Sequence, residues 1–105
     1  MAATREVLVR CRHILAAHYG PRLRGVVLYG SAARAEAGPE SDLDLLVVLE
    51  DPVDVFSEVR RLVDLLYPVQ LDSDRYISAK PASAGEYETG RLQLYRIAKR
   101  EGVAV

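Results

Sequence analysis

Two short groups of residues in the first half of the chain have side chains suited to chemistry on a charged substrate. Gly30 and Ser31 follow a short apolar run, and ten residues separate Ser31 from the pair Asp42 and Asp44. Residues i and i+2 of a strand point to the same face, so both carboxylates would lie on one side while Leu43 turns to the core. Two like charges this close repel each other, and a divalent cation, an arginine or a shared proton would relieve the repulsion.

The residues before the two aspartates predict a phosphate site next to them. Gly30 lets a ligand approach the backbone, Ser31 offers a hydroxyl, and the amides at the start of a helical turn attract anions. Mg²⁺ prefers oxygen ligands and is usually held by one or two carboxylates together with water and substrate phosphates. Arg34 either contacts a phosphate or pairs with Glu36 or Glu40, and the sequence leaves both readings open.

Hydrophobic spacing predicts the elements that must position these residues. Apolar intervals of three and four indicate a helix from Thr4, as N-cap, to Gly20-Pro21, a second from Val55 to about Tyr67-Pro68, and a last one over 84–100 with an interruption at Gly90. Short apolar or alternating runs predict strands at 26–29, 43–49 and 75–80, with a helical turn over 31–34. This order predicts an α/β (α+β) class, with a small mixed sheet flanked by helices.

Composition predicts one domain, residues 1–105, because a chain of 105 residues that is 50% hydrophobic suits a single core. The net charge of −1 gives no broad basic field, so a nucleic-acid partner is not expected. The first residues contain neither a signal peptide nor a membrane span, and the chain has a single cysteine. We therefore expect a soluble cytoplasmic protein without a membrane partner.

The run GSAARAEAGPESDLDLLVV resembles the GSxARG…SDxDLxV pattern of minimal nucleotidyltransferases (MNT proteins) of the DNA polymerase β-like superfamily, and LYRIAKREGVAV is similar to their tail. The resemblance implies the polymerase β-like fold. It also implies that Gly30 and Ser31 bind the β- and γ-phosphates of a nucleoside triphosphate such as ATP, and that Asp42 and Asp44 hold two Mg²⁺ ions. A nucleotidyl group would then pass to an acceptor hydroxyl with release of pyrophosphate.

The chain departs from the family pattern in two places. Ala35 stands where relatives often have glycine, and the third carboxylate that active members carry on the third strand is not evident. Ser78 falls at its expected position, Asp74 is the nearest carboxylate on the predicted strand, and Asp72 is an alternative in the preceding loop. We take Asp74 as the third catalytic residue beside Asp42 and Asp44. A neutral residue there would weaken the inner metal site and slow the transfer.

Three functions are compatible with these residues. Larger relatives hold the acceptor in an extra helical domain, for which 105 residues leave no room, so the acceptor site would come from a partner. The resemblance points first to an antitoxin that adenylylates a tyrosine of a HEPN-domain toxin. A catalytically decayed module that neutralises such a partner by contact is the second, and an aminoglycoside-type nucleotidyltransferase working as a homo-oligomer is the third.

Overall fold

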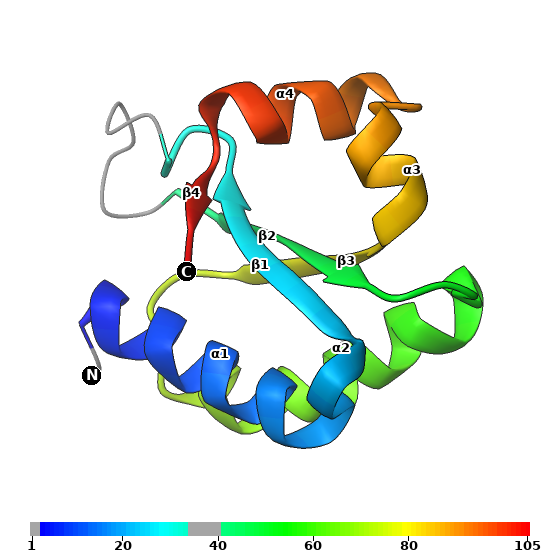
Figure 1. Ribbon diagram of the computed structural model, residues 1–105. Helices are drawn as coiled ribbons and strands as arrows, with labels where there is room; N and C mark the ends of the chain where they lie inside the picture. Colours follow the sequence, from blue (N-terminus) through cyan, green and yellow to red (C-terminus); the bar gives the residue numbers. More distant parts are fainter. Residues whose placement is uncertain (1–2, 34–40) are drawn as a thin grey trace.

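A four-stranded sheet forms the middle of the molecule, and helices cover both of its faces (Figure 1). The computed structural model describes residues 3–33 and 41–105. In chain order its elements are α1 (Thr4–Tyr19), the 3-10 helix η1 (Gly20–Arg22), β1 (Leu23–Tyr29), β2 (Leu43–Leu49), α2 (Val55–Leu71), β3 (Ile77–Ser83), α3 (Ala84–Thr89), α4 (Gln93–Glu101) and β4 (Val103–Ala104). The strand order is β3-β2-β1-β4, with β2 and β3 parallel and the other pairs antiparallel. The predicted fold class is confirmed.

The central strand β2 explains why the sheet needs a helical layer on each face. Its sequence LDLLVVL is apolar at consecutive positions after Asp44, and successive side chains point to opposite faces. Leu45 and Val47 therefore enter the core on the side of α1 and α2, while Leu46 and Val48 enter the core on the side of α3 and α4. Both faces of β2 are buried, and Asp44 is the one residue of the strand that is partly exposed.

The larger core lies under α1 and α2, which pack side by side on one face of the sheet (Figure 1). Helical spacing places Cys11 and Leu15 of α1 and Leu62 and Leu66 of α2 in this core. Burying a leucine of this kind contributes about 1.5–3 kcal/mol each. No helix in the described parts of the chain is long and apolar enough to cross a membrane.

A second, smaller core lies under α3 and α4 on the opposite face. Tyr95 and Ala98 of α4 pack with Tyr29 of β1 and Leu46 of β2. The hydroxyl of Tyr29 is buried and has no hydrogen-bond partner among the residues that the structure describes. This face of the sheet is the one on which Asp44 lies, because Asp44, Leu46 and Val48 alternate with the residues of the other core.

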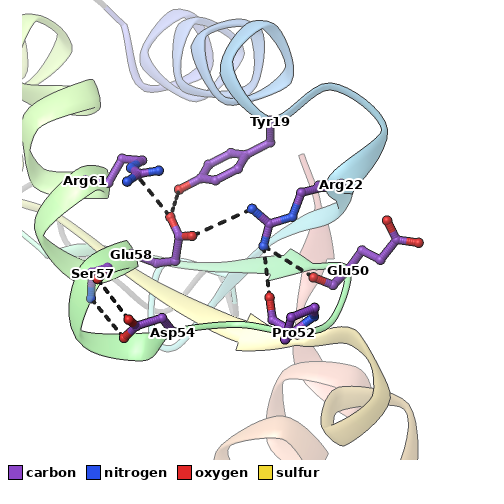
Figure 2. A network of polar contacts seen from close by, with 8 residues as sticks. All are labelled: Tyr19, Arg22, Glu50, Pro52, Asp54, Ser57, Glu58 and Arg61. Carbon is purple, nitrogen blue, oxygen red and sulfur yellow. Dashed lines mark hydrogen bonds and ion pairs between the residues drawn. The ribbon is translucent and has the colours of Figure 1, made fainter.

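A buried charged network fixes the end of the sheet where β1 begins and β2 ends (Figure 2). Glu58 of α2 is only 5% exposed, and one of its oxygens accepts a hydrogen bond of 2.8 Å from the hydroxyl of Tyr19. Arg22 and Arg61 approach the same carboxylate at 3.8 Å each. Asp54 caps the N-terminus of α2 by accepting hydrogen bonds from Ser57. Burial and the hydrogen bond to Glu58 raise the pKa of the Tyr19 hydroxyl.

The second helix is longer than predicted, because α2 continues through Pro68 to Leu71. Pro68 has no N–H to donate to the carbonyl of Asp64, one turn earlier, and we had expected the helix to end there. Both residues are exposed, so water can hydrogen-bond the freed carbonyl. Leu66 and Val69 on the inner side of the same turn remain packed in the core and hold the helix together.

The third strand begins two residues later than predicted and runs through Pro81 to Ser83. Proline is tolerated because β3 is an edge strand with β2 on one side only. The side chain of Gln70 covers part of the open edge, since its oxygen accepts from the N–H of Ile77 at 2.7 Å and its nitrogen donates to the carbonyl of Arg75 at 2.9 Å. These features leave few groups on which another strand could add.

The predicted last helix is two helices, because Gly90 adopts the left-handed φ of 67° and ends α3. The two-residue strand β4 after Gly102 was not predicted; pairing with β1 creates it, and its own residues carry too little pattern to show it. The strand β1 also begins earlier than expected, at Leu23. Thr4 is the first residue of α1 and not its N-cap, which is Ala3 without a capping side chain.

Candidate functional site

The candidate site lies where β1 ends and β2 begins. The antiparallel register pairs Tyr29 with Asp44, so the turn that leaves β1 passes directly over the start of β2. Gly30 has a φ of 77°, and a Cβ built on it would lie 2.6 Å from Oδ2 of Asp44. Only glycine fits this conformation and this close contact. The structure therefore brings Gly30 and Asp44 together as neighbours.

Ser31 lies in the turn that follows, which is closed by a hydrogen bond of 3.1 Å from the N–H of Ala33 to the carbonyl of Gly30. Ser31 is partly exposed and can be reached by a ligand at the end of the sheet. Arg34, the last residue of the predicted helical turn, lies outside the described residues, as do its alternative partners Glu36 and Glu40.

Asp42 and Asp44 carry negative charge that no neighbour among the described residues neutralises by a hydrogen bond or an ion pair. Asp42 is exposed just before β2, whereas Asp44 is half-buried. Burial raises the pKa of the Asp44 carboxyl, the charge of Asp42 raises it further, and Lys80 acts in the opposite direction. Ionised Asp44 is thus destabilised in the folded chain and would be stabilised by a cation.

The third carboxylate is not where the sequence suggested. The parallel register places Ser78 directly beside Asp44, while Asp74 lies exposed in the bend before β3 and not on the strand. The longer α2 and the later start of β3 cause this difference. Asp72 is bound by Arg10 of α1 in an ion pair of 2.8 Å, which commits it elsewhere. The catalytic role of Asp74 stays a prediction.

The donor set fits one divalent cation better than two. Asp42 and Asp44 supply two carboxylates one residue apart, which suits a single Mg²⁺ completed by water and phosphate oxygens. Residues 3–33 and 41–105 contain no group of three or more His, Cys, Asp or Glu side chains placed to hold a metal ion. The second expected ion would find the neutral hydroxyl of Ser78 where an anionic ligand is needed.

Sequence reasoning missed Lys80. The register pairs it with Leu46, so it lies on the same face as Asp44 and Ser78, two residues beyond Ser78 along β3. Its ammonium forms no hydrogen bond or ion pair within the described part of the chain. The alternation of the strand could have identified Lys80, because side chains at 78 and 80 must share a face once the strand is placed.

An apolar groove that the sequence did not indicate runs between α2, β3 and the start of α4. Its volume is about 690 Å³, and Ser78 and Lys80 are among its lining residues. Val55, Val63 and Tyr67 line it from successive turns of α2 and are exposed. Apolar side chains gathered in one exposed groove are typical of a surface that binds another molecule.

Comparisons with known proteins agree with this geometry. A family model described as a nucleotidyltransferase domain matches residues 8–101. No curated protein matches the sequence.

Two solved structures share the fold. A spectinomycin adenyltransferase from Enterococcus faecialis, solved with ATP and spectinomycin, superimposes with a TM-score of 0.73 at 21% identity over 98% of this chain and 56% of that chain. A candidate nucleotidyltransferase from Sulfolobus solfataricus gives a TM-score of 0.59 at 20% identity over 95% of this chain and 79% of that chain. The present chain thus spans little more than half the length of the adenyltransferase.

The family match covers nearly the whole described sheet and its helices, and the structural neighbours have the same arrangement of elements. Within this arrangement, the turn at Gly30 lies directly against Asp44, one of the two aspartates of the candidate site. The chain therefore belongs to the nucleotidyltransferase domain family, whose model matches residues 8–101.

Proposed function

We propose that this chain moves a nucleoside monophosphate, AMP in the first instance, from a Mg²⁺-bound nucleoside triphosphate to an acceptor hydroxyl. The observation that carries the proposal is the contact between the Gly30 turn and Asp44. The backbone of this turn, which phosphates can approach, lies beside a carboxylate that forms no ion pair with the described residues. The use of ATP fits a cytoplasmic protein. The solved adenyltransferase, which holds ATP, supports the choice of nucleotide.

In this reaction the acceptor oxygen attacks the α-phosphorus, and the bond from that phosphorus to the oxygen bridging to the β-phosphate breaks. The electron pair leaves with pyrophosphate, and the acceptor proton passes to Asp74, our candidate for that role. The turn at Gly30 and Ser31 holds the β- and γ-phosphates. Asp42 and Asp44 would hold Mg²⁺, which would supply positive charge against the phosphate oxygens. The chain contributes position and electrostatics without a covalent intermediate.

Binding of Mg·ATP tests the site directly. At about 100 times the dissociation constant, a ligand of the folded state adds ~2.7 kcal/mol of stability, which for a chain of this size raises Tm by on the order of 10 °C. Thermal unfolding with Mg²⁺ and ATP should show this shift, and the Asp42→Asn, Asp44→Asn double variant should lose it. An unchanged Tm of the wild-type chain in the presence of Mg·ATP would refute the site.

For the acceptor we propose a tyrosine of a helical partner of the HEPN class, with this chain as its antitoxin. The apolar groove supports this proposal, because it opens beside Ser78 and Lys80 and so leads to the end of the sheet where transfer would occur. The edge of β3 at the groove is covered by Gln70 and interrupted by Pro81, which favours a helix over an added strand as occupant.

Co-expression with such a partner should give a complex that survives size-exclusion chromatography at micromolar concentration. Val63→Glu, in the groove and 61% exposed, should disrupt the complex, whereas Val9→Glu on α1, 42% exposed and outside the groove, should not. Mass spectrometry of the partner after incubation with Mg·ATP should show one added AMP. A bound but unmodified partner would support the decayed binding module, and equal binding by both variants would refute the groove.

A second acceptor, an aminoglycoside-type small molecule, is favoured by the likeness to the spectinomycin adenyltransferase. Incubation of the chain with Mg·ATP and spectinomycin tests it, with the mass of the antibiotic as the readout. An adenylylated antibiotic formed by the wild-type chain and not by Asp44→Asn would establish this activity. An antibiotic of unchanged mass, beside a positive result with the protein partner, would exclude it. In the positive case analytical ultracentrifugation shows whether two copies form the site.

A further inference from the structure

The charges at the candidate site do not balance with two divalent ions. A pair of such ions, about 3.5–4 Å apart, requires anionic ligands on both sides. Here the position beside Asp44 on β3 is occupied by the neutral Ser78, and the described residues contain no cluster of three metal-binding side chains. On this face of β2 and β3, the described residues that carry negative charge are Asp42 and Asp44, and one ion satisfies both.

The face that lacks a third carboxylate carries a cation instead. Ser78 and Lys80 alternate with core residues of β3, so both project on the Asp44 side of the sheet. A diagonal neighbour on adjacent strands lies ~7–8 Å away, within reach of a lysine side chain.

The ammonium of Lys80 is not committed to another role among the described residues. It is exposed, forms no hydrogen bond or ion pair there, and lines the groove beside Ser78. The other lysine of the chain differs, because the ammonium of Lys99 donates to the carbonyl of Glu88 at 2.8 Å and lies over the ring of Tyr87. Lys99 is therefore a matched control for Lys80.

We propose that the site holds one divalent ion, between Asp42 and Asp44, and that the ammonium of Lys80 supplies the second positive charge to the bound phosphates. A lysine ammonium is a compact point charge that binds phosphate well. Ser78 is then the residue that makes room for this arrangement, because a carboxylate in its place would pair with Lys80 or attract a second ion. This inference rests on the proposed function and specifies how its site is charged.

Mn²⁺ in place of Mg²⁺ makes the stoichiometry measurable without turnover. The chain is dialysed with Mn²⁺ and an ATP analogue whose α,β-bridge is a methylene group, and bound metal and nucleotide are counted per chain. We expect one Mn²⁺ per nucleotide and an electron paramagnetic resonance spectrum of isolated ions. Ser78→Asp combined with Lys80→Met should bind two ions and give the spectrum of a spin-coupled pair.

Lys80→Met should weaken binding of the analogue about tenfold without changing the count of one ion. Lys80→Arg should recover part of that loss, and Lys99→Met should leave affinity within about twofold of wild type. Two coupled ions in the wild-type chain would overturn the single-ion site, and unchanged affinity in Lys80→Met would overturn the role of Lys80; either result would leave the proposed function standing. Absence of any bound nucleotide would instead overturn the proposed function, and this inference with it.

Discussion

Acidic side chains at the two ends of β2 differ in whether they have hydrogen-bond or ion-pair partners. At its start, Asp42 and Asp44 have no hydrogen bond or ion pair among the described residues, although Asp44 is half-buried. Just beyond its other end, the acidic side chains all have partners: Glu50 pairs with Arg24, Asp51 accepts from Ser83 and Gly85, Asp54 caps α2, and Glu58 binds Tyr19 and two arginines.

The difference separates acidic side chains that stabilise the fold from the two that we propose as ligands of a cation. Glu58 is the most deeply buried acidic side chain described, and it is also the one with the most partners, as the cost of burying a charge demands. Asp44 bears part of the same cost, and burial raises its pKa although the charge of Lys80 acts in the opposite direction. A partly buried carboxylate with no hydrogen bond or ion pair is typical of a site that binds a charged ligand.

Substitution of Asp44 should have the largest effect and tests the difference between the two ends most directly. Asp44→Asn should reduce nucleotidyl transfer by on the order of 100-fold or more, because a cation ligand is lost. The same substitution should raise the Tm of the ligand-free chain by about 1–3 °C, since the amide removes a partly buried charge. Activity and thermal unfolding measured on one preparation check both. A fall in the ligand-free Tm would show that Asp44 has a stabilising partner.

At the opposite end, Glu58→Ala should lower stability by about 2 kcal/mol, because it leaves the hydroxyl of Tyr19 buried without its acceptor. For a chain of this size the loss corresponds to a fall in Tm on the order of 10 °C. Urea unfolding measures the free energy, and binding of Mg·ATP to the folded fraction should persist. The control is Glu50→Ala, which removes an exposed pair with Arg24 and should cost about 0.5 kcal/mol or less. Equal losses of stability in Glu58→Ala and Glu50→Ala would contradict the greater importance of the buried Glu58 network.

Two glycines with positive φ, Gly30 at the candidate site and Gly20 at the end of α1, allow a matched comparison. Substitution by alanine at Gly30 or at Gly20, where φ is 77° and 56°, should lower the free energy of unfolding by on the order of 1–3 kcal/mol. The added methyl group at Gly30 would collide with the carboxylate of Asp44, whereas nothing lies within 4 Å of the corresponding position at Gly20. Titration with Mg·ATP should therefore show weakened binding for Gly30→Ala alone. Similar affinities in the two variants would exclude a role for the turn in binding.

The smallest effect concerns Asp51. Hydrogen bonds from the hydroxyl of Ser83 and the N–H of Gly85 lower the pKa of the Asp51 carboxyl from 3.8. The ionised form is therefore favoured by folding, so its stabilisation is present above pH 3.8 and is lost as pH falls through the lowered pKa. Asp51→Asn keeps only one acceptor atom, so its Tm should lie slightly below wild type at about pH 6, and the difference should shrink as pH falls below 3.8. A constant difference across that range would contradict the charge as the cause.

Much of the positioning was predictable from local pattern. The apolar run at 43–49 predicted β2 with its observed bounds, and the alternation of a strand placed Asp42 and Asp44 on one face with Leu43 turned to the core. The third strand was harder, because Pro81 and the alternation around it obscured its bounds, and the neighbour that tolerates proline there is distant in sequence. Asp74 was misplaced for the same reason, since a shift of two residues in a strand start moves a side chain off the strand.

The sequence by itself determined the turn, the two carboxylates and the family pattern, because these depend on residue types at fixed short spacings. Tertiary structure alone decided which residues from other elements join them. The parallel register of β2 and β3 set Ser78 and Lys80 beside Asp44, and the packing of α2 onto the sheet buried Glu58 among its partners. The physical reason is that strand pairing and helix packing bring together residues tens of positions apart, and no local spacing records which partners they will meet.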